Sequence, residues 1–493
     1  MRRREFLQLS VLASGASFLN APSFLHAETP DSPSATTSLR LAIHPHRTGH
    51  TIGPDFTGLS YESAQLGDPT FFALSNTELV GLIRRLGKSG ILRIGGNTSE
   101  YCYWTPKPTA AQLSAASAPV NPSTGKHPDQ VRRITPEAVR NLSAFIDATG
   151  WKLIYGLNMG TGTPEDAADE AAYVMKLIGP RLVSFQLCNE PDLFSRNGIR
   201  KPGYNFADFA REWKHFYDVI RTRVPNAPFS GPDTAFNNEW LVPFAKEFKS
   251  DIVFLSQHYY AEGPPTNPSM TIGRLLRPNP RLVAEFAGMA QTHKDTGLPF
   301  RLTETNSCYQ GGKKGVSNTF ASALWGAELM YQLAAQGGIG INFHGGGYGW
   351  YTPIAGTQKA GFEARPIYYG MLMFALAGAG QLVENHLSSP QPEDTIAAYS
   401  LRTSSGLKTV LFNKSASSSL RLAMDPGQRA ERASMLLLTA PDLASTSGVT
   451  LGGASVNAQG DWAATRRVTL NHKHGVFTAD LPAASAALVS FED

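Results

Sequence analysis

Apolar residues along this chain recur with a period of two in short runs that end in polar residues. Residues 183–191 read Val-Ser-Phe-Gln-Leu-Cys-Asn-Glu-Pro, so apolar positions alternate until Asn, Glu and Pro interrupt them. Alternation that stops at a proline predicts a β-strand whose last side chains reach a loop. Residues 300–306, Phe-Arg-Leu-Thr-Glu-Thr-Asn, repeat this design. We therefore expect Glu190 and Glu304 at the carboxyl ends of two strands.

Eight strand-like runs of this kind alternate with segments of helical periodicity. The expected strands are Phe56–Glu62, Ile91–Gly96, Lys152–Asn158, Leu182–Glu190, Pro228–Asp233, Ile252–Tyr260, Phe300–Asn306 and Ile339–Gly345. The helices expected after them are Ser75–Leu86, Thr135–Thr149, Pro164–Ile178, Phe206–Arg223, Asn238–Lys249, Pro280–Thr296, Ser317–Gln336 and Arg365–Ala377. Eight β-then-α units over roughly 320 residues predict an α/β fold of the (β/α)8 TIM-barrel type.

Polar residues gather at the ends of these strands, where a TIM barrel builds its active site. They are Glu62, Asn97, Asn158, Asn189, Glu190, Asp233, His258, Tyr260, Glu304 and His344. A doubly wound open sheet, the alternative α/β fold, would instead predict one glycine-rich phosphate loop. Gly156, Gly160 and Gly162 follow the third strand and resemble such a loop, but lone glycines of this kind fit a βα turn more simply. The barrel is therefore the expected fold.

A second domain is expected after Gly380, where short alternating runs are separated by Gly, Ser, Asn and Asp. This pattern predicts an antiparallel β-sandwich over residues 381–493, following a catalytic barrel over residues 51–380. Residues 28–50 are expected to form a polar linker and a strand, Ser38–Ile43. That strand precedes the barrel and has no place in it, so we expect it to join the sandwich.

The N-terminus has the pattern of an export signal. Arg3-Arg4 precedes a modest apolar stretch, interrupted by Ser and Gly, that continues to Leu25. Twin arginines before such a stretch indicate a bacterial twin-arginine signal peptide with cleavage near Ala27. The stretch is too short and too interrupted for a membrane anchor. We expect residues 1–27 to be removed and the protein to be periplasmic or secreted, with no membrane partner.

The composition is that of a globular protein, with 42% apolar and 17% charged residues among 493. The net charge is +4, and removing the three arginines and one glutamate among residues 2–5 leaves +2. A chain this close to neutral lacks the charge that nucleic-acid binding requires. Its three cysteines predict no disulfide framework. His44 and His46 lack a third ligand, so we expect no metal and no cofactor.

Two glutamates at two strand ends have the chemistry that a glycosidase requires. One carboxylic acid protonates the leaving oxygen, and the other carboxylate attacks the anomeric carbon or activates water. A single glutamate at a strand end is usually a solvated surface residue. Two glutamates within the same strand pattern favour the catalytic interpretation.

Several motifs together resemble one family of enzymes. Residues 187–191 (Leu-Cys-Asn-Glu-Pro) and 302–305 (Leu-Thr-Glu-Thr) are similar to retaining hydrolases with glutamates at the ends of barrel strands four and seven. Residues 92–96 (Leu-Arg-Ile-Gly-Gly), 257–260 (Gln-His-Tyr-Tyr) and 304–312 (Glu-Thr-Asn-Ser-Cys-Tyr-Gln-Gly-Gly) more closely resemble the β-glucuronidase and heparanase family, glycoside hydrolase family 79. The resemblance covers the whole barrel and fits the appended sandwich. It implies a β-glucuronidase that works through a covalent glycosyl-enzyme intermediate.

The resemblance also implies roles for individual residues. Glu190 would be the acid/base and Glu304 the nucleophile. The other implied residues are Asn189 for the sugar 2-hydroxyl, Glu62 and Asn97 for other hydroxyls, and Tyr260 as a hydrogen-bond donor to the nucleophile.

Glucuronate carries a carboxylate on C5, so its site must also bind an anion. Tyr309 lies five residues after Glu304, close enough to line the same sugar, and Gly311 follows it. Glycine lets backbone N–H groups approach an anion, and Tyr309 and Tyr351 each offer a hydroxyl donor. Lys313 would either add positive charge or lie in solvent. We expect Tyr309, Gly311 and Tyr351 to bind the carboxylate.

One departure from heparanase bears on the substrate. Heparanases carry basic clusters for a sulfated polymer and are matured by internal cleavage. This chain has only Arg132-Arg133 and Lys313-Lys314 as tight basic pairs and no obvious excised linker. It thus looks like a single-chain bacterial exo-β-glucuronidase acting on small-molecule or oligosaccharide glucuronides. The alternatives are an endo-acting, heparanase-like hydrolase of a glucuronic-acid polysaccharide and a non-catalytic glucuronide-binding lectin.

Overall fold

The computed structural model describes residues 37–109, 112, 132–388 and 395–492. The export signal expected at residues 1–27 lies outside these ranges, as does the linker expected to follow it. The barrel, the C-terminal domain and every residue expected in the active site lie within them.

Eight parallel strands form one sheet that closes into a barrel. They are β2 (Thr57–Glu62), β3 (Ile91–Gly95), β6 (Lys152–Gly156), β7 (Leu182–Gln186), β8 (Ser230–Thr234), β9 (Phe254–Glu262), β10 (Phe300–Cys308) and β11 (Ile341–His344). Their order is β7-β6-β3-β2-β11-β10-β9-β8, and a parallel bridge from Phe185 to Phe229 joins the two outer strands. The order along the chain is thus the order around the barrel, which confirms the expected TIM barrel.

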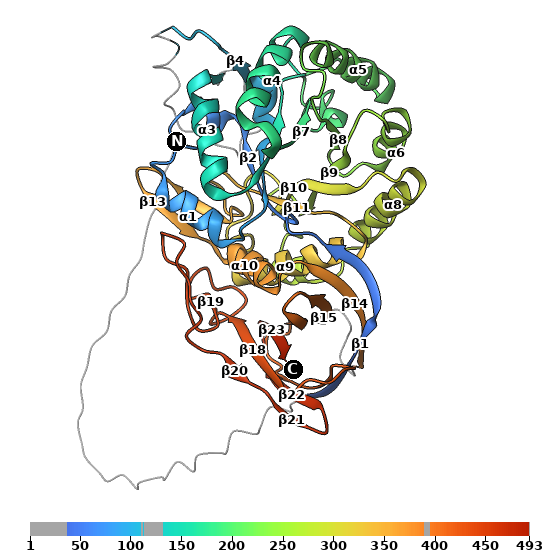
Figure 1. Cartoon of the computed structure of the whole chain (residues 1–493), viewed down its shortest axis with the longest axis vertical. Helices are drawn as coiled ribbons and strands as arrows, with labels where there is room; N and C mark the ends of the chain where they lie inside the picture. The colour runs from blue at the N-terminus through green and yellow to red at the C-terminus, as the bar shows by residue number, and fades with distance from the viewer. Residues whose placement is uncertain (1–36, 110–111, 113–131, 389–394, 493) are drawn as a thin grey trace, which may run out of the picture. The chain divides into compact units, whose positions relative to one another are not determined.

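Helices follow the strands and surround them in Figure 1. They are α1 (Thr77–Arg85), α3 (Pro136–Thr149), α4 (Pro164–Ile178), α5 (Phe206–Arg223), α6 (Asn238–Glu247), α7 (Ile272–Leu276), α8 (Pro280–Thr296), α9 (Phe320–Ala335) and α10 (Pro366–Ala377). Local signals set where several of them begin. At α4, for example, the Thr163 side chain accepts the Asp166 N–H and Pro164 occupies the first turn. The five-residue α7 is too short for helical periodicity to indicate it.

The barrel strands are buried on both faces, because one face meets the helices and the other fills the barrel. All nine residues of β10 are buried. Near its start, Arg301 is 1% exposed and donates to Asn342 Oδ1 and to the carbonyls of Asp55 and Phe56. This guanidinium ties β10 to its neighbours at the amino-terminal end of the barrel. The polar residues expected in the active site lie at the opposite end.

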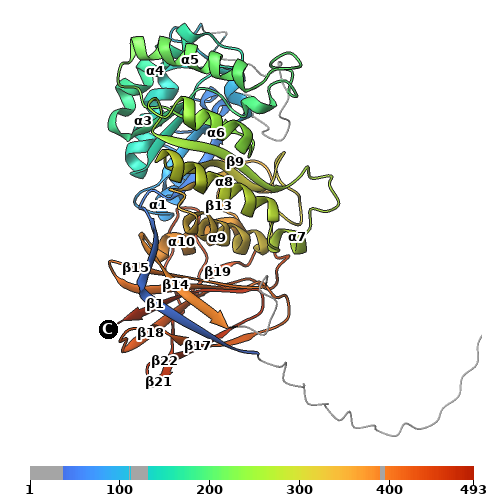
Figure 2. The ribbon, with the colours of Figure 1, turned by 90° about the vertical axis from the view of Figure 1, so that its right-hand side faces the viewer.

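The C-terminal domain is an eleven-stranded, mainly antiparallel sheet with an apolar core of its own. Its strands are β1 (Thr37–Ile52), β14 (Gly380–Ser388), β15 (Ile396–Thr403), β16 (Gly406–Asn413), β17 (Leu420–Asp425), β18 (Arg432–Thr439), β19 (Thr450–Leu451), β20 (Val468–Thr469), β21 (Asn471–Lys473), β22 (Val476–Leu481) and β23 (Ser485–Glu492). The N-terminal β1 pairs antiparallel with β14 and parallel with β17 (Figure 2). It reaches Ile52, so it is longer than the strand expected at Ser38–Ile43.

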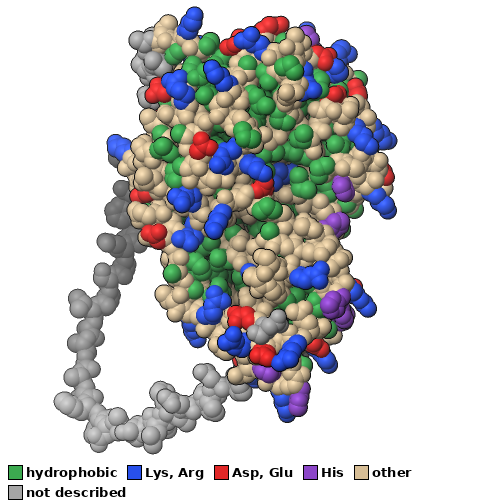
Figure 3. Space-filling view, viewed as in Figure 1, with side chains coloured by type: hydrophobic (Ala, Val, Ile, Leu, Met, Phe, Trp, Pro, Cys, Tyr) green, Lys and Arg blue, Asp and Glu red, His purple; other side chains and the backbone are tan. Residues whose placement is uncertain are grey.

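Smaller elements that the sequence pattern does not reveal complete the fold. A hairpin of β12 (Ile354–Thr357) and β13 (Gly361–Ala364) precedes α10, and β4 (Cys102–Trp104) pairs with β5 (Arg132–Ile134). Short 3-10 turns occur at η1 (Ser63–Gly67), η2 (Asn97–Tyr101), η6 (Gly179–Arg181) and η7 (Pro191–Leu193). Among the described helices, none has the length and hydrophobicity that a membrane span requires. On the face shown in Figure 3, acidic and basic side chains are interspersed.

Candidate active site

The carboxyl ends of the barrel strands bring polar side chains together around one buried arginine. Arg93 of β3 is 1% exposed. Its guanidinium donates to Glu304 Oε2 at 2.7 Å, to Asp233 Oδ2 at 2.6 Å and to Asn189 Oδ1 at 2.9 Å. Its Nε donates to Gln186 Oε1 at 2.7 Å. One cation therefore fixes the positions of side chains carried by β7, β8 and β10.

A buried histidine extends this network to Glu190. His258 of β9 has Nδ1 3.0 Å from Glu190 Oε1 and Nε2 3.1 Å from Asp233 Oδ2. Burial alone would lower the pKa of His258, but the Asp233 and Glu304 carboxylates raise it to about 10. Each ring nitrogen faces a carboxylate oxygen, an arrangement that favours the protonated ring. Burial would raise the pKa of Asp233, but Arg93 and His258 hold it well below its usual value.

Glu190 lies beyond the end of β7 in a left-handed backbone conformation, with φ 48° and ψ 56°. This region is uncommon for a residue other than glycine and costs backbone energy, so the surrounding structure must hold it there. The Glu190 N–H donates to the Asp233 carbonyl at 2.9 Å, and the Glu190 carbonyl accepts the Leu193 N–H. The strand expected at Leu182–Glu190 therefore ends early, at Gln186.

Glu304 of β10 has a side chain that is 5% exposed and enclosed by donors. Tyr260 donates to its Oε1 at 2.7 Å, Arg93 donates to its Oε2, and His344 Nδ1 lies 3.6 Å from Oε2. Burial would raise the pKa of Glu304, but His344, His258 and Arg93 hold it well below its usual value. Glu304 is thus a carboxylate whose two oxygens are both oriented by hydrogen bonds.

The two glutamates are close enough to share one reaction centre. A carboxylate oxygen of Glu190, a ring nitrogen of His258 and a carboxylate oxygen of Glu304 lie within 4.8 Å of one another. Retaining glycosidases hold their two carboxyl groups about 5–5.5 Å apart, and inverting ones about 6.5–9.5 Å apart. These three side chains could also hold a cation, but both His258 nitrogens face carboxylates and Arg93 already pairs with Glu304. The spacing favours a retaining pair.

The side chains expected to bind sugar hydroxyls border this cluster. Glu62, at the end of β2, accepts the Thr98 N–H at 2.9 Å and the Thr98 hydroxyl at 2.6 Å. Gly96 permits this approach, because it has φ 76° and a Cβ there would lie 2.5 Å from Glu62 Oε2. Asn189 Nδ2 donates to Asn97 Oδ1 at 3.3 Å. The structure therefore brings Glu62, Asn97 and Asn189 to the same end of the barrel as the two glutamates.

The residues expected to bind a carboxylate lie around Tyr260. The ring centroids of Tyr309 and Tyr351 are 6.3 Å and 6.2 Å from that of Tyr260. Tyr351 is 2% exposed, and a hydrogen bond joins its phenol group to the backbone of Gly311. Lys313, in contrast, donates from Nζ to a main-chain carbonyl of the loop after β9, at 2.9 Å. Tyr309, Gly311 and Tyr351 are thus brought together, whereas the lysine is anchored to another loop.

The sequence analysis assigns no role to four members of this cluster: Arg93, Asp233, His258 and His344. Three of them stand at expected strand ends, so their location is predicted but their partners are not. Arg93 gives a different signal, because a charged residue inside the apolar run Leu-Arg-Ile must point into the barrel or break the strand. A buried cation in that position requires anionic partners, and the structure supplies two of them.

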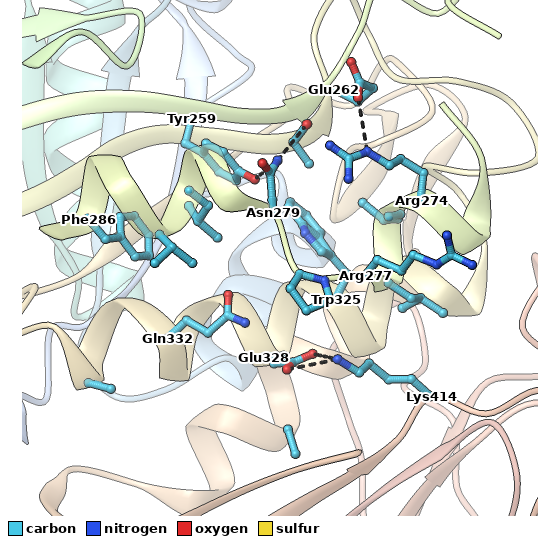
Figure 4. A pocket seen from close by; sticks show the side chains of 18 of the residues that line it. Tyr259, Glu262, Arg274, Arg277, Asn279, Phe286, Trp325, Glu328, Gln332 and Lys414 are labelled. Carbon is cyan, nitrogen blue, oxygen red and sulfur yellow. Dashed lines mark hydrogen bonds and ion pairs between the residues drawn. The ribbon is translucent and has the colours of Figure 1, made fainter. Parts of the chain in front are cut away.

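A cavity of about 400 Å³ lies beside β9 (Figure 4). Tyr259 and Ala261 line the cavity, whereas Tyr260, between them in the strand, bonds to the reaction centre. Other walls come from α7, α8, α9 and the C-terminal domain, and include the ion pair of Glu328 with Lys414. Because side chains alternate along a strand, this cavity belongs to the outer face of the barrel.

Comparisons with known proteins relate both domains to glycosidases. Residues 397–488 match the family model described as the glycosyl hydrolase family 79 C-terminal β domain. The chain is 26% identical over 494 residues to a β-glucuronidase of Aspergillus niger, a match that covers 89% of this chain and 88% of the relative. It is 24% identical over 395 residues to a heparanase of Bos taurus, covering 69% of each chain.

Solved structures share the fold. A 4-O-α-L-rhamnosyl-β-D-glucuronidase from Fusarium oxysporum 12S matches 92% of this chain and 100% of its own, with a TM-score of 0.72 and 19% identity. A family 51 arabinofuranosidase from Xanthomonas axonopodis pv. citri also matches 92% of this chain and 100% of its own, with a TM-score of 0.68 and 15% identity. At these identities the likeness establishes the architecture alone, a TIM barrel with a β domain.

Proposed function

We propose that this chain, whose C-terminal β domain and relatives support membership of glycoside hydrolase family 79, is a retaining β-glucuronidase. It releases β-linked D-glucuronic acid from glucuronides through a covalent glycosyl-enzyme intermediate. The observation that carries the proposal is the close pair of carboxylates, Glu190 and Glu304, held by Arg93 and His258 at the carboxyl ends of the barrel strands.

The geometry supports a two-step displacement. Glu304 attacks the anomeric carbon while Glu190 protonates the oxygen of the departing aglycone. The lowered pKa of Glu304 keeps it ionised at neutral pH, and Tyr260 and Arg93 hold its two oxygens. Glu304 loses its charge when the glycosyl ester forms, but Arg93 retains Asp233 as an anionic partner. Glu190 then takes a proton from a water molecule, which attacks the same carbon and releases β-glucuronate.

Selection of a glucuronide is assigned to the residues around Tyr260. Tyr309 and Tyr351 offer hydroxyl donors and Gly311 a backbone N–H to the carboxylate on C5. Lys313 is anchored to a main-chain carbonyl, so we assign it no contact with the substrate. The residues assigned to the ring hydroxyls are Glu62, Asn97 and Asn189, with Asn189 at the 2-hydroxyl.

An aryl glycoside assay tests the proposal. We expect the protein to hydrolyse 4-nitrophenyl β-D-glucuronide with kcat/KM at least about a hundredfold above that for the matching β-D-glucoside. Glu304→Gln should abolish this activity. Glu190→Ala should remain partly active on glucuronides with very good leaving groups and should be rescued by azide. A faster rate on the glucoside would contradict the proposal, and binding of the glucuronide without turnover would indicate a lectin.

Glu170→Gln is a matched control for these variants. Glu170 of α4 is also a buried glutamate, and it accepts the Tyr155 hydroxyl at 2.7 Å outside the reaction centre. A glutamine oxygen can accept the same hydrogen bond. This variant should therefore retain the activity of the unchanged protein. The comparison shows whether Glu304→Gln loses activity because it lacks the nucleophile or only because a buried carboxyl group has been replaced.

Release of terminal glucuronate, rather than cleavage within a polymer, is supported by the distribution of charge. A sulfated polysaccharide requires a continuous basic surface. On the face in Figure 3 the basic side chains are interspersed with acidic ones, and Lys313 is bound to main chain. Incubation with a glucuronic-acid polysaccharide should therefore release monosaccharide from the start. Early formation of intermediate-sized fragments would instead indicate endo-acting, heparanase-like hydrolysis.

We also propose that the protein is exported by the twin-arginine route. The support is the Arg3-Arg4 pair and the apolar stretch before Ala27. In a bacterial host, the exported protein should begin near residue 28 on N-terminal sequencing, and replacing both arginines by lysine should stop export. Export that persists after this replacement would contradict the proposal.

A further inference from the structure

A buried glutamate outside the reaction centre contacts the backbone that carries Glu190. Glu100, in η2 after β3, is 1% exposed. Its Oε1 accepts the Asn189 N–H at 2.7 Å, and its Oε2 accepts the Gly160 N–H at 2.5 Å. Gly160 follows β6 and Asn189 follows β7, so one carboxyl group bridges the ends of three neighbouring strands.

We propose that Glu100 is a positioning residue for Glu190, an inference that rests on Glu190 being the acid/base of the proposed function. Two successive N–H groups are fixed at this point: Glu100 holds that of Asn189, and the Asp233 carbonyl holds that of Glu190. The left-handed conformation of Glu190 requires such support. Without the Glu100 contact, the chain can relax toward an extended conformation, and the Glu190 carboxyl moves away from the leaving oxygen.

The surroundings of Glu100 are shaped to admit its carboxyl group. A Cβ at residue 160 would lie 2.5 Å from Glu100 Oε2, so a glycine there leaves the backbone N–H within reach. Arg200, paired with Glu212, donates to the Gly160 carbonyl at 2.6 Å and supports the same loop from its other side. Gly160, one of the glycines that resemble a nucleotide loop in the sequence, thus has a packing role beside β7.

The chemistry of the contact requires an acceptor at both positions. Burial raises the pKa of Glu100 to about 8, although the Asn189 and Gly160 N–H groups favour its ionised form. Either oxygen of a carboxyl group can accept an N–H, whether the group is ionised or protonated. Glutamine of the same shape has one oxygen and one NH2 group, so one of the two backbone donors would face another donor. Glu100→Gln therefore breaks one of the two hydrogen bonds and opposes two donors at that point, with little change in volume.

Two leaving groups separate positioning from general stability. Loss of 2,4-dinitrophenolate needs no proton from Glu190, whereas loss of phenol does. We expect Glu100→Gln to lower kcat/KM on phenyl β-D-glucuronide by about tenfold or more, a part of the roughly 10²–10⁴ that general acid catalysis supplies. On 2,4-dinitrophenyl β-D-glucuronide we expect a loss of less than about threefold. Glu170→Gln, the matched buried control, should change neither value.

A second variant, Gly160→Ala, tests the same contact without relying on Glu100→Gln. Gly160→Ala presses on the same carboxyl group from the other side, so it should produce the same selective loss even if Glu100→Gln fails to fold. Equal losses on both substrates would show that Glu100 only supports the fold, and no loss on either would show that Glu190 is positioned without it. Either result overturns the inference. If the protein without any substitution is inactive on both substrates, the proposed function itself is contradicted.

Discussion

The mouth of the barrel and the contact between α9 and the C-terminal domain both bury charged side chains, but in different ways. At the contact, Glu328 and Lys414 form an isolated pair, and Lys414 Nζ lies 2.9 Å from Glu328 Oε2 (Figure 4). At the mouth, four charged residues each have two charged partners. These residues are Arg93, Asp233, His258 and Glu304.

The difference shows which buried charges the fold requires and which the chemistry requires. A buried ion pair seldom stabilises a fold more than well-packed apolar residues of similar volume would. A linked set of charges at one point is therefore a poor means of stabilisation, and its retention indicates a reaction that develops or neutralises charge there. An isolated pair such as Glu328 and Lys414 carries no such implication, so the two regions should respond differently to substitution.

Removing the central cation should produce the largest effect. Arg93→Met leaves Asp233 and Glu304 without their shared partner, so we expect kcat/KM on an aryl glucuronide to fall at least about a thousandfold. Breaking a buried pair in this way should also lower the free energy of unfolding by about 3–5 kcal/mol, measured by urea denaturation. Arg140 of α3 is an exposed arginine, so Arg140→Met serves as a surface control and should change neither quantity. If the activity of Arg93→Met is within tenfold of that of the unchanged protein, the linked charges at the mouth are not required for the reaction.

The tyrosines beside the mouth should affect one substrate and not the other. Each charge-assisted hydrogen bond to a carboxylate contributes about 1.5–3 kcal/mol. Tyr309→Phe and Tyr351→Phe should each lower kcat/KM for an aryl glucuronide by roughly ten- to a hundredfold. The matching glucoside lacks the carboxylate and serves as the control. Equal losses on both substrates, or no loss on either, would remove this loop from the recognition site.

The contributions of two buried carboxyl groups to the stability of the fold should change with pH in opposite directions. The pKa of Asp233 is lowered in the folded protein, so its contribution to stability is full above its usual value of 3.8 and is lost as the pH falls. Burial raises the pKa of Glu170 to about 8, so its contribution falls as the pH rises from 4.5 through 8. Relative to the unchanged protein, Glu170→Gln should therefore gain stability from pH 4.5 to 8, and Asp233→Asn should lose less stability in acid. Parallel urea-midpoint curves for all three proteins would contradict both assignments.

Replacing the isolated pair should have the smallest effect. The double variant Glu328→Leu with Lys414→Met removes both charges together, so we expect the free energy of unfolding to change by less than about 1 kcal/mol. The kcat/KM for an aryl glucuronide should not change. The single variant Lys414→Met leaves Glu328 buried and unpaired, and should be less stable than the double variant. A loss of activity in the double variant would show that this contact also serves catalysis.

The sequence predicts the strands and their polar ends because alternation and its interruption are local. All eight barrel strands overlap the period-two runs, although β7 ends before Glu190 and β10 continues four residues beyond Glu304. Partners across the barrel are different, because they meet only when the sheet closes. Arg93 is 140 positions from Asp233 and 211 from Glu304, and the spacing along the chain gives no sign of either contact.

Backbone contacts set a second limit on sequence prediction. Glu100 bonds to main-chain N–H groups, which every residue but proline carries, so no side-chain pattern reveals it. The same holds for Lys313, which the sequence leaves either in solvent or at the substrate. Its amino group instead donates to a main-chain carbonyl. The left-handed turn at Glu190 likewise depends on a main-chain carbonyl of another strand, that of Asp233.

The stereochemistry of the first product tests the central claim most directly. If Glu304 forms a covalent intermediate and Glu190 directs water to the same face, the configuration at the anomeric carbon is retained. Proton NMR of the hydrolysis of an aryl β-D-glucuronide should then show β-glucuronate first, with the α-anomer appearing only later by mutarotation. If α-glucuronate appears first, water attacks directly, and the assignment of Glu304 as a nucleophile is wrong.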